Sequence, residues 1–284
     1  MRGISFTKLS GAGNDFILID RKLNSEFNLS SEFIKKICDR RKSIGADGVL
    51  FISDLDNYAF EMKYFNADGS TGSLCANGAR CALRYGFVSG RVDGDLVKFR
   101  ANEKDYSGVV IDEKDIKFFL NEPEKVKLNF KIKAAGQLIS ASYIDTGSPH
   151  VVIKLKDILE NPLKNFSFYK SVNDLPVYEI GKEIRYSRDF APEGTNVNFI
   201  DIFDEGINIR TYERGVENET LACGTGSVAA ALISFLNDNL KPPIKLFVKS
   251  GDVLKVDFSY ENQKFRDVSL TGPAEVVFTG ELTI

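Results

Sequence analysis

The sequence contains two copies of one local pattern, and each copy carries a cysteine. In the second copy, an alternating stretch at 207–212 leads through a polar loop to Cys223, and the apolar run 228–236 follows without a helix breaker. In the first copy, an alternating stretch at 60–65 leads through a turn-rich loop to Cys75 and a helix-like run. Strict alternation predicts a half-buried strand, and runs of good helix formers predict helices. The repetition therefore predicts two related halves, each with a cysteine at the start of a helix.

The similarity between the two copies extends beyond the cysteines. The segment 44–52 resembles 192–200, and 11–17 weakly resembles 145–151. Many short predicted strands and few predicted helices indicate the α+β class. The duplication suggests a cleft between two similar halves, with the cysteine helices pointing into it.

A break in composition at 121–125 marks a candidate linker. It predicts an N-terminal half of residues 1–121 and a C-terminal half of residues 122–274. The last strand-like segment, 275–284, is expected to complete the N-terminal half.

Composition limits the kinds of binding partner and the cellular compartment that are expected for this protein. The net charge of the 284 residues is −3 and no long basic run occurs, which argues against a nucleic-acid partner. No stretch approaches the roughly 20 apolar residues that cross a membrane, and the N-terminus lacks the apolar core of a signal peptide. Four cysteines without a secretion signal favour a reducing, cytoplasmic location over a disulfide scaffold.

The four cysteines fall into two classes. Cys38 and Cys81 lie inside helical patterns, where a cysteine usually packs as a small hydrophobic residue. Cys75 and Cys223 recur in register, and each follows a polar loop. Unpaired backbone N–H groups at a helix start favour an anion and can lower the pKa of a thiol. Cys75 and Cys223 are therefore the candidate reactive residues.

The sequence gives little support for a metal or dinucleotide site. Zinc sites need paired Cys-x-x-Cys or histidine spacings, but the chain has a single histidine, His150, and no such spacing. The Gly11-Ala12-Gly13 turn lacks the third glycine of a dinucleotide fingerprint, because Phe16 stands there and the next segment is strand-like.

Several motifs together resemble the diaminopimelate epimerase family, and the resemblance spans nearly the whole chain. The motif at 212–226, which contains Cys223, is long and specific. The others are the Asn14 turn, the segment 64–70, the segment 75–81, Pro149-His150, and Glu193 with Asn196-Val197.

The resemblance implies a fold, an activity and partners. The fold would have two pseudo-symmetric halves, each a strongly curved mixed β-sheet wrapped around a central helix, with the active site in the cleft between them. The activity would be the interconversion of LL- and meso-diaminopimelate at one α-carbon, by proton transfer between a thiolate and a thiol, in lysine and peptidoglycan-precursor synthesis. It implies no cofactor and no metal, a small amino-acid substrate, no nucleic-acid or membrane partner, and a homodimer.

The resemblance also implies roles for particular residues. Cys75 and Cys223 are similar in position to the two bases of the family. His150 and Glu213 resemble the residues that tune the thiol pKa values, and Glu213 also the residue that holds the reactive ammonium group. The backbone groups that would hold the reacting carboxylate belong to Ala76, Asn77, Gly224 and Thr225.

The distal amino-acid end of the substrate would be bound by polar side chains. By resemblance these are Asn14, Asn66, Ser148, Asn196 and Arg214. Ala76 stands where the family usually has glycine, and Ser148 stands where asparagine is common.

Two other hypotheses remain open from the sequence. One is a different cofactor-independent amino-acid racemase, of the histidine or proline type, on the same scaffold. The other is a cytosolic binding protein in which the cysteines are structural.

Overall fold

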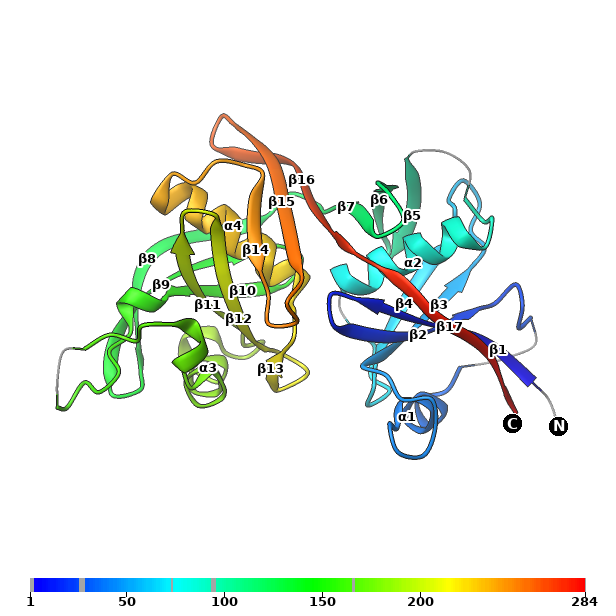
Figure 1. The fold of residues 1–284 in the computed structure, drawn as a ribbon, viewed down its shortest axis with the longest axis horizontal. Coiled ribbons are helices and arrows are strands. Elements are labelled where there is room, and N and C mark those ends of the chain that lie inside the picture. The colour runs from blue at the N-terminus through cyan, green and yellow to red at the C-terminus, as the bar shows by residue number, and fades with distance from the viewer. Residues whose placement is uncertain (1–2, 26–28, 73, 93–95, 165–166, 284) are drawn as a thin grey trace. The chain divides into compact units, whose positions relative to one another are not determined.

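The computed structural model (Figure 1) describes residues 3–25, 29–72, 74–92, 96–164 and 167–283. The chain divides into two compact units. Unit 1 comprises Met1–Phe119 with Thr271–Ile284, and unit 2 comprises Leu120–Leu270.

Unit 1 is a mixed sheet that contacts two helices. Its strands lie in the order β17-β1-β2-β3-β4-β5-β6-β7, with parallel pairs only at β2–β3 and β4–β5 among the pairings named here. The elements in chain order are β1 (Gly3–Gly11), β2 (Asn14–Asp20), α1 (Ser31–Cys38), β3 (Gly48–Ser53), β4 (Glu61–Asn66), α2 (Ala76–Val88), β5 (Val97–Ala101), β6 (Lys104–Val110), β7 (Asp115–Phe119) and β17 (Glu275–Thr283).

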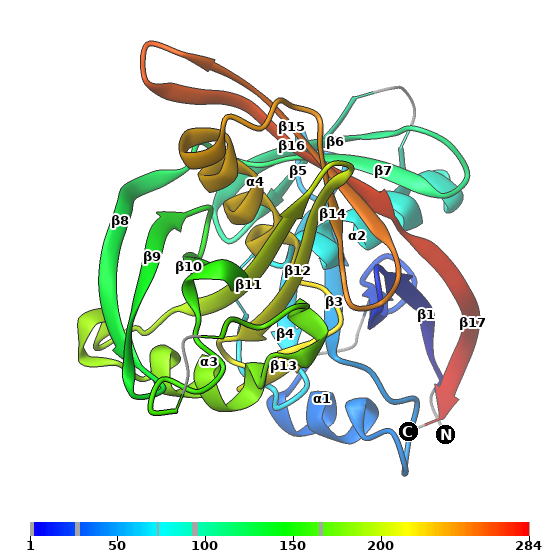
Figure 2. The same cartoon turned by 60° about the vertical axis from the view of Figure 1, so that its left-hand side comes forward.

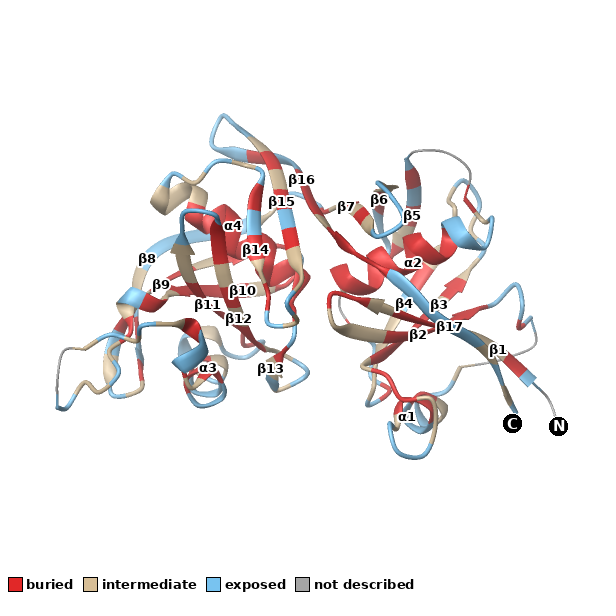
Figure 3. Cartoon of the chain, in the orientation of Figure 1, coloured by how far each residue is buried: buried red, intermediate tan, exposed pale blue. Residues whose placement is uncertain are grey.

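Helix α2 is the central element of unit 1. Every residue from Ala76 to Gly86 is buried, and the burial colouring of Figure 3 follows the helix over this length. The helix contacts β1 to β4, β6, β7 and β17, so the sheet curves around it. A helix buried on all sides needs small or apolar residues, which explains the alanines and glycines in its first turns. The start of α2 is thereby fixed against the sheet.

Unit 2 repeats this arrangement. Its strands lie in the order β8-β9-β10-β11-β12-β14-β15, with parallel pairs at β10–β11 and β12–β14, and β13 pairs with the end of β12. The elements are β8 (Glu124–Ala134), β9 (Gln137–Asp145), β10 (Pro149–Lys154), α3 (Val177–Arg185), β11 (Asn196–Phe203), β12 (Gly206–Glu213), β13 (Asn218–Thr220), α4 (Gly224–Asp238), β14 (Ile244–Phe247) and β15 (Val253–Glu261), with three short 3₁₀ segments at Leu155–Asp157, Val172–Asp174 and Arg188–Phe190. Strand β16 (Lys264–Pro273) runs from unit 2 into unit 1, which resumes at Thr271.

Helix α4 occupies the centre of unit 2 as α2 occupies that of unit 1. It is buried from Gly224 to Ser234 and contacts β9 to β12, β14 and β15, which pass around it in Figure 2. The two units share one order of elements: an antiparallel hairpin, a parallel pair, an antiparallel pair, a helix and a second parallel pair. In unit 1 this order is β1-β2-β3-β4-α2-β5, and in unit 2 it is β9-β10-β11-β12-α4-β14. The predicted α+β fold of two related halves, each a curved mixed sheet around one helix, is confirmed.

Strand β8 differs from the sequence prediction. The segment 121–125 reads as a linker, yet β8 begins at Glu124 and pairs with β9 along its length, with register shifts between Glu124 and Phe130. The first six residues of β8 are exposed, and only Ile132 and Ala134 are buried. Residues 125–134 nevertheless alternate strictly between polar and apolar residues, so the sequence carries a strand signal here that the linker interpretation of 121–125 does not use.

Candidate active site

Cys75 is the residue immediately before the first turn of α2. Its backbone is extended, and its sulfur accepts a hydrogen bond from the Gly78 N–H at 3.3 Å. The thiol is half-buried. A sulfur that caps the free N–H groups of a helix is favoured as an anion. A Cβ at Gly78 would lie at an ordinary contact distance of 3.6 Å from this sulfur, and its one close contact would be with a methyl of Leu50 at 2.9 Å.

Cys223 holds the same position before α4 but is more deeply buried. Its sulfur lies 3.7 Å from the Thr225 Oγ1, and its carbonyl accepts from both the backbone and the hydroxyl of Ser227. A Cβ at Gly226 would lie 2.3 Å from the Asn198 Oδ1, so only glycine fits there. Cys75 and Cys223 are therefore topologically equivalent, one in each unit.

Cys38 and Cys81 lie in the interior, as the sequence predicts. Burial raises the pKa of the Cys38 thiol to about 11 and also raises the pKa of the Cys81 thiol. A thiol whose anion is penalised by burial is a poor nucleophile or base.

Asn14 and Asn77 contact each other beside the start of α2. The Asn77 side-chain amide donates to the Asn14 Oδ1 at 2.6 Å, and the Asn14 amide donates to the Asp47 carboxylate at 3.0 Å. Asn66, the last residue of β4, instead donates to the Ser70 Oγ at 3.0 Å. Two of the three predicted asparagines of unit 1 are thus held in one hydrogen-bonded chain.

Sequence reasoning missed the ionic cluster that supports this chain. Arg40 donates to both oxygens of Asp15 at 2.9 and 2.6 Å and to Asp47 at 2.7 Å, and Lys8 pairs with Asp15 at 2.7 Å. Burial opposes ionisation of Asp15, but the hydrogen bonds from Arg40 and Lys8 outweigh it and lower its pKa to about 2. Asp15 lies 25 residues before Arg40 and 32 before Asp47, and the β2–β3 pairing brings these two segments together.

Arg80 fixes the first turn of α2 from within. It is fully buried, and its guanidinium donates to the Asn77 Oδ1 at 3.0 Å and to the Ala76 carbonyl at 3.4 Å. Ala76 begins the helix and does not adopt a positive φ, so its methyl group causes no backbone strain. The alanine at this position therefore leaves the helix start intact.

In unit 2, the imidazole of His150 lies at the centre of a buried polar network. Its Nε2 is 2.9 Å from the Ser148 Oγ and 2.9 Å from the Thr225 Oγ1, and its Nδ1 is 3.1 Å from the Asn198 amide nitrogen. Burial, with a smaller effect of the Arg214 charge, lowers the pKa of His150 to about 3. The imidazole is therefore neutral at physiological pH.

Asn196 links this network to the loop that carries Arg214. Its Oδ1 accepts from the Arg214 backbone N–H at 2.8 Å, and its amide donates to the Pro149 carbonyl at 2.9 Å and to the Ser148 Oγ at 3.5 Å. Glu213 ends β12, and its carboxylate accepts from the Thr220 hydroxyl at 2.8 Å. The structure thus brings the predicted residues of unit 2 into one region around the start of α4.

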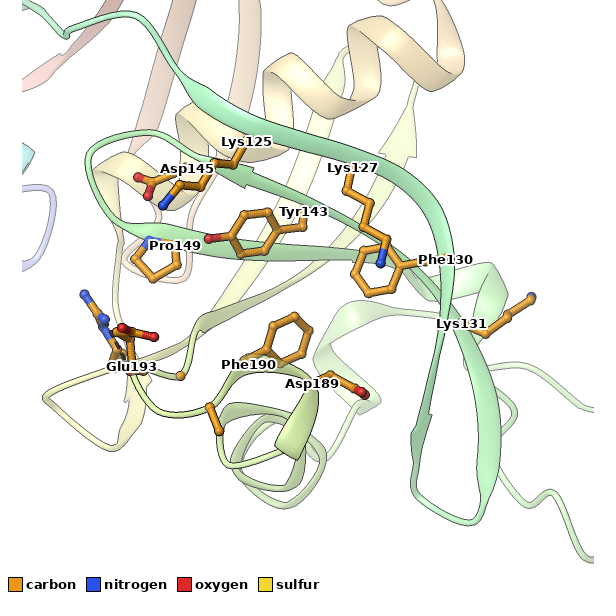
Figure 4. A pocket seen from close by; sticks show the side chains of 13 residues that line it. Lys125, Lys127, Phe130, Lys131, Tyr143, Asp145, Pro149, Asp189, Phe190 and Glu193 are labelled. Carbon is orange, nitrogen blue, oxygen red and sulfur yellow. Dashed lines mark hydrogen bonds between the residues drawn. The ribbon is translucent and has the colours of Figure 1, made fainter.

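A cavity of about 560 Å³ opens beside this region within unit 2 (Figure 4). Arg214 lines it, with its guanidinium donating to the Glu193 carbonyl at 3.3 Å. The other lining residues are mostly aromatic or charged, with three small or cyclic ones: Lys125, Lys127, Phe130, Lys131, Tyr143, Asp145, Pro149, Asp189, Phe190, Ala191, Glu193 and Gly194. A cationic side chain in a partly aromatic recess suits the carboxylate of a small organic molecule.

Among the described residues, no group of three or more His, Cys, Asp or Glu side chains is placed to hold a metal ion. No helix in the described part of the chain is long and apolar enough to cross a membrane.

The sequence is similar to proteins of one family along nearly its whole length. The family model described as diaminopimelate epimerase matches residues 6–125 and 142–277. The diaminopimelate epimerase of Chlorobaculum tepidum is 37% identical over 279 residues, which cover 97% of this chain and all of that protein. That of Aquifex aeolicus is 38% identical, covering 99% of this chain and 98% of that protein.

Solved structures share the fold at much lower identity. A phenazine biosynthesis protein of the PhzF family from Bacillus anthracis superposes with a TM-score of 0.73 at 14% identity, covering both chains fully. A probable proline racemase from Agrobacterium radiobacter gives 0.70 at 13% identity, covering 99% of this chain and 93% of that chain. These likenesses concern the fold alone. The sequence matches decide the family, and the chain belongs to the diaminopimelate epimerase family.

Proposed function

We propose that the chain is an isomerase that interconverts LL- and meso-diaminopimelate by moving a proton at one α-carbon. The observation that carries this proposal is the equivalence of Cys75 and Cys223, each set before the first turn of a buried helix. Relatives named diaminopimelate epimerase at 37 and 38% identity support the substrate.

The two cysteines would act as a base and an acid on opposite faces of the α-carbon. One thiolate takes the α-proton and becomes a thiol, while the other thiol gives its proton to the opposite face and becomes a thiolate. The reverse reaction exchanges these roles. Two residues of one type suit a reaction whose two directions are chemically alike.

The backbone at the two helix starts would stabilise the carbanion. Its negative charge spreads into the neighbouring carboxylate. The backbone N–H groups of Ala76, Asn77, Gly224 and Thr225 would donate hydrogen bonds to that carboxylate. Removal of one oriented donor from a dry site costs about 3–4 kcal/mol, whereas a helix dipole contributes about 0.3–2 kcal/mol. The oriented donors would therefore contribute more than the dipoles.

The rest of the substrate would be bound by side chains that do not react. Arg214 offers a two-pronged partner for the distal carboxylate, and Glu213 a partner for the reactive ammonium group. We propose that Asn14, Asn66, Ser148 and Asn196 bind the remaining polar atoms of the distal end. Binding at this distance from the α-carbon orients the reacting centre.

We also infer that the enzyme works in the cytosol, in lysine and peptidoglycan-precursor synthesis, and as a homodimer. The homodimer rests on the family resemblance and on exposed apolar side chains on β17, where Val277 is 56% and Phe278 48% exposed. Sedimentation of the wild type and of Phe278→Glu tests it. A dimer that persists unchanged in the variant would place the interface elsewhere.

Isotope exchange tests the proposed function. Incubation with LL- or meso-diaminopimelate in D₂O, without added cofactor, should interconvert the isomers and place deuterium at the α-carbon. Cys75→Ala and Cys223→Ala should each abolish interconversion, and the matched double variant Cys38→Ala/Cys81→Ala should retain it. Exchange with another amino acid but not with diaminopimelate would favour the alternative racemase, and activity in both active-site variants would refute the two-base mechanism.

A further inference from the structure

The buried hydrogen-bond network around His150 extends through Thr225 to the sulfur of Cys223. The direction of donation along it can be followed from Asn198. Asn198 lies on β11 opposite Thr211 of β12 and is fully buried. Its side-chain nitrogen is 2.9 Å from the Val151 carbonyl, which can only accept, so this atom is the amide N–H donor. The amide oxygen accepts from the Thr211 hydroxyl at 3.0 Å. The orientation of the amide is therefore fixed.

The same Asn198 nitrogen lies 3.1 Å from the His150 Nδ1. Since this nitrogen is a donor, Nδ1 must accept and carries no proton. A neutral imidazole then has its proton on Nε2, where it can donate to the Ser148 Oγ or the Thr225 Oγ1, both 2.9 Å away. Burial keeps the ring neutral, and the Arg214 charge acts in the same sense.

A second asparagine on the same strand supports this direction. Asn196 lies two residues from Asn198, and alternate residues of a strand share one face. Its amide donates to the Ser148 Oγ at 3.5 Å. The arrangement in which the His150 Nε2–H and the Asn196 amide both donate to Ser148 directs the Ser148 proton to the Thr225 Oγ1 at 3.3 Å before substrate binds.

The Thr225 hydroxyl then accepts from the network, and its proton is left for Cys223. The two side chains lie 3.7 Å apart, within hydrogen-bond distance for sulfur. We propose that the Thr225 hydroxyl is the hydrogen-bond donor to the Cys223 thiolate, and that Asn198 fixes this direction by holding His150 in the tautomer protonated on Nε2. Thr225 and Asn198 are thus positioning residues for the second base.

The Thr225 side chain thereby has a role beside that of its backbone N–H, and the catalytic meaning of this role rests on the proposed function. The same network explains why residue 226 is glycine, because any side chain there would displace Asn198. Hydrogen bonds to a charged group are worth more than those to a neutral one. The thiolate of Cys223 is therefore stabilised by a donor that the protein supplies before substrate binds.

The single histidine of the chain allows a direct test by nitrogen NMR. In protein labelled with ¹⁵N-histidine, the two ring signals belong to His150 without further assignment. We expect a protonated Nε2 and a bare Nδ1 from neutral pH down to about pH 4, and Asn198→Ala should lose this single tautomer. A proton on Nδ1, or titration near the ordinary histidine pKa, would overturn the proposal.

Alkylation of Cys223 tests the last hydrogen bond without measuring epimerisation. In a Cys75→Ala background, the rate of Cys223 carboxamidomethylation by iodoacetamide is followed against pH by peptide mapping. Thr225→Val should raise the midpoint by roughly one pH unit, Thr225→Ser should restore it, and Asn198→Ala should raise it in the same sense. Ser142→Ala, which removes another buried hydroxyl of unit 2, is the control and should leave the midpoint unchanged.

Equal midpoints for the parent, Thr225→Val and Thr225→Ser would refute the proposed donor. If Thr225→Val does not fold, a raised midpoint in Asn198→Ala together with the NMR tautomer still decides the question. Neither readout depends on diaminopimelate. A protein with this tautomer and midpoint shift but no isotope exchange would therefore contradict only the proposed function.

Discussion

Substitution of Gly226 by alanine tests how tightly the start of α4 is packed on the Asn198 network. The new Cβ would lie 2.3 Å from the Asn198 Oδ1, whereas ordinary contacts begin near 3.4 Å, so the amide must move by about 1 Å. That movement breaks or weakens its hydrogen bonds to Val151, His150 and Thr211. At about 0.5–1.5 kcal/mol for each of the three bonds, the loss is roughly 1.5–4.5 kcal/mol.

Alanine also brings a gain, because it favours a helix over glycine by up to about 1 kcal/mol. The expected net loss in the free energy of unfolding is therefore about 2 kcal/mol. Urea denaturation followed by circular dichroism measures it, since the chain has no tryptophan for fluorescence. The same glycine in unit 1 provides the control: Gly78→Ala meets only a methyl of Leu50 at 2.9 Å and breaks no hydrogen bond of this kind, so its change should stay below about 1 kcal/mol.

A double variant isolates the contact itself. In an Asn198→Ala background the obstructing oxygen is gone, so adding Gly226→Ala should cost nothing further, and the two changes should be strongly non-additive. Additive losses, or a Gly226→Ala protein as stable as the wild type, would refute the packing argument.

Three further predictions concern charge. Arg40→Ala should lower the unfolding free energy by about 1 kcal/mol at pH 6. The stability that comes from the depressed pKa of Asp15 is present above the ordinary pKa of an aspartate and is lost as pH falls toward 2. The difference in unfolding free energy between wild type and variant should therefore shrink as the pH is lowered. The pKa of His150 is also depressed, to about 3, so the unfolded chain binds its proton first; stability should fall as pH drops from about 6.5 toward 4, and the slope should be shallower in His150→Gln if the network causes it. Arg214→Ala should raise the KM for diaminopimelate about 10- to 100-fold, with Arg214→Lys intermediate in steady-state assays; an unchanged KM would remove Arg214 from the distal site.

The duplicated fold could be predicted because its signals are local. Alternation and helix-forming runs around Cys75 and Cys223 lie within short windows, and the predicted helix starts agree with α2 and α4. Strand β8 has the same local alternation over 125–134 and was predictable in this way, but the polar segment 121–125 drew the interpretation toward a linker.

The hydrogen-bond network was missed for a different reason. Asn198 and His150 are 48 residues apart, and only the register of β10 on β11 brings them together. A weak signal did exist, since Asn198 interrupts the apolar run of Val197, Phe199 and Ile200 in a buried strand. A polar residue at such a position needs a partner, but the sequence alone does not say which.

The pairing of β17 with β1 has a consequence for how the chain is made. Unit 2 is continuous from Leu120 to Leu270, whereas unit 1 needs residues from both sides of it. On the ribosome, the residues of β1 emerge first but wait for a neighbour that is translated after the whole of unit 2. Because domains fold as units during synthesis, the second unit can finish folding while the first still exposes an unpaired strand edge. The order of synthesis and the order of completion are thus reversed, and a pause in translation before Glu275 would leave the older half of the protein open to aggregation.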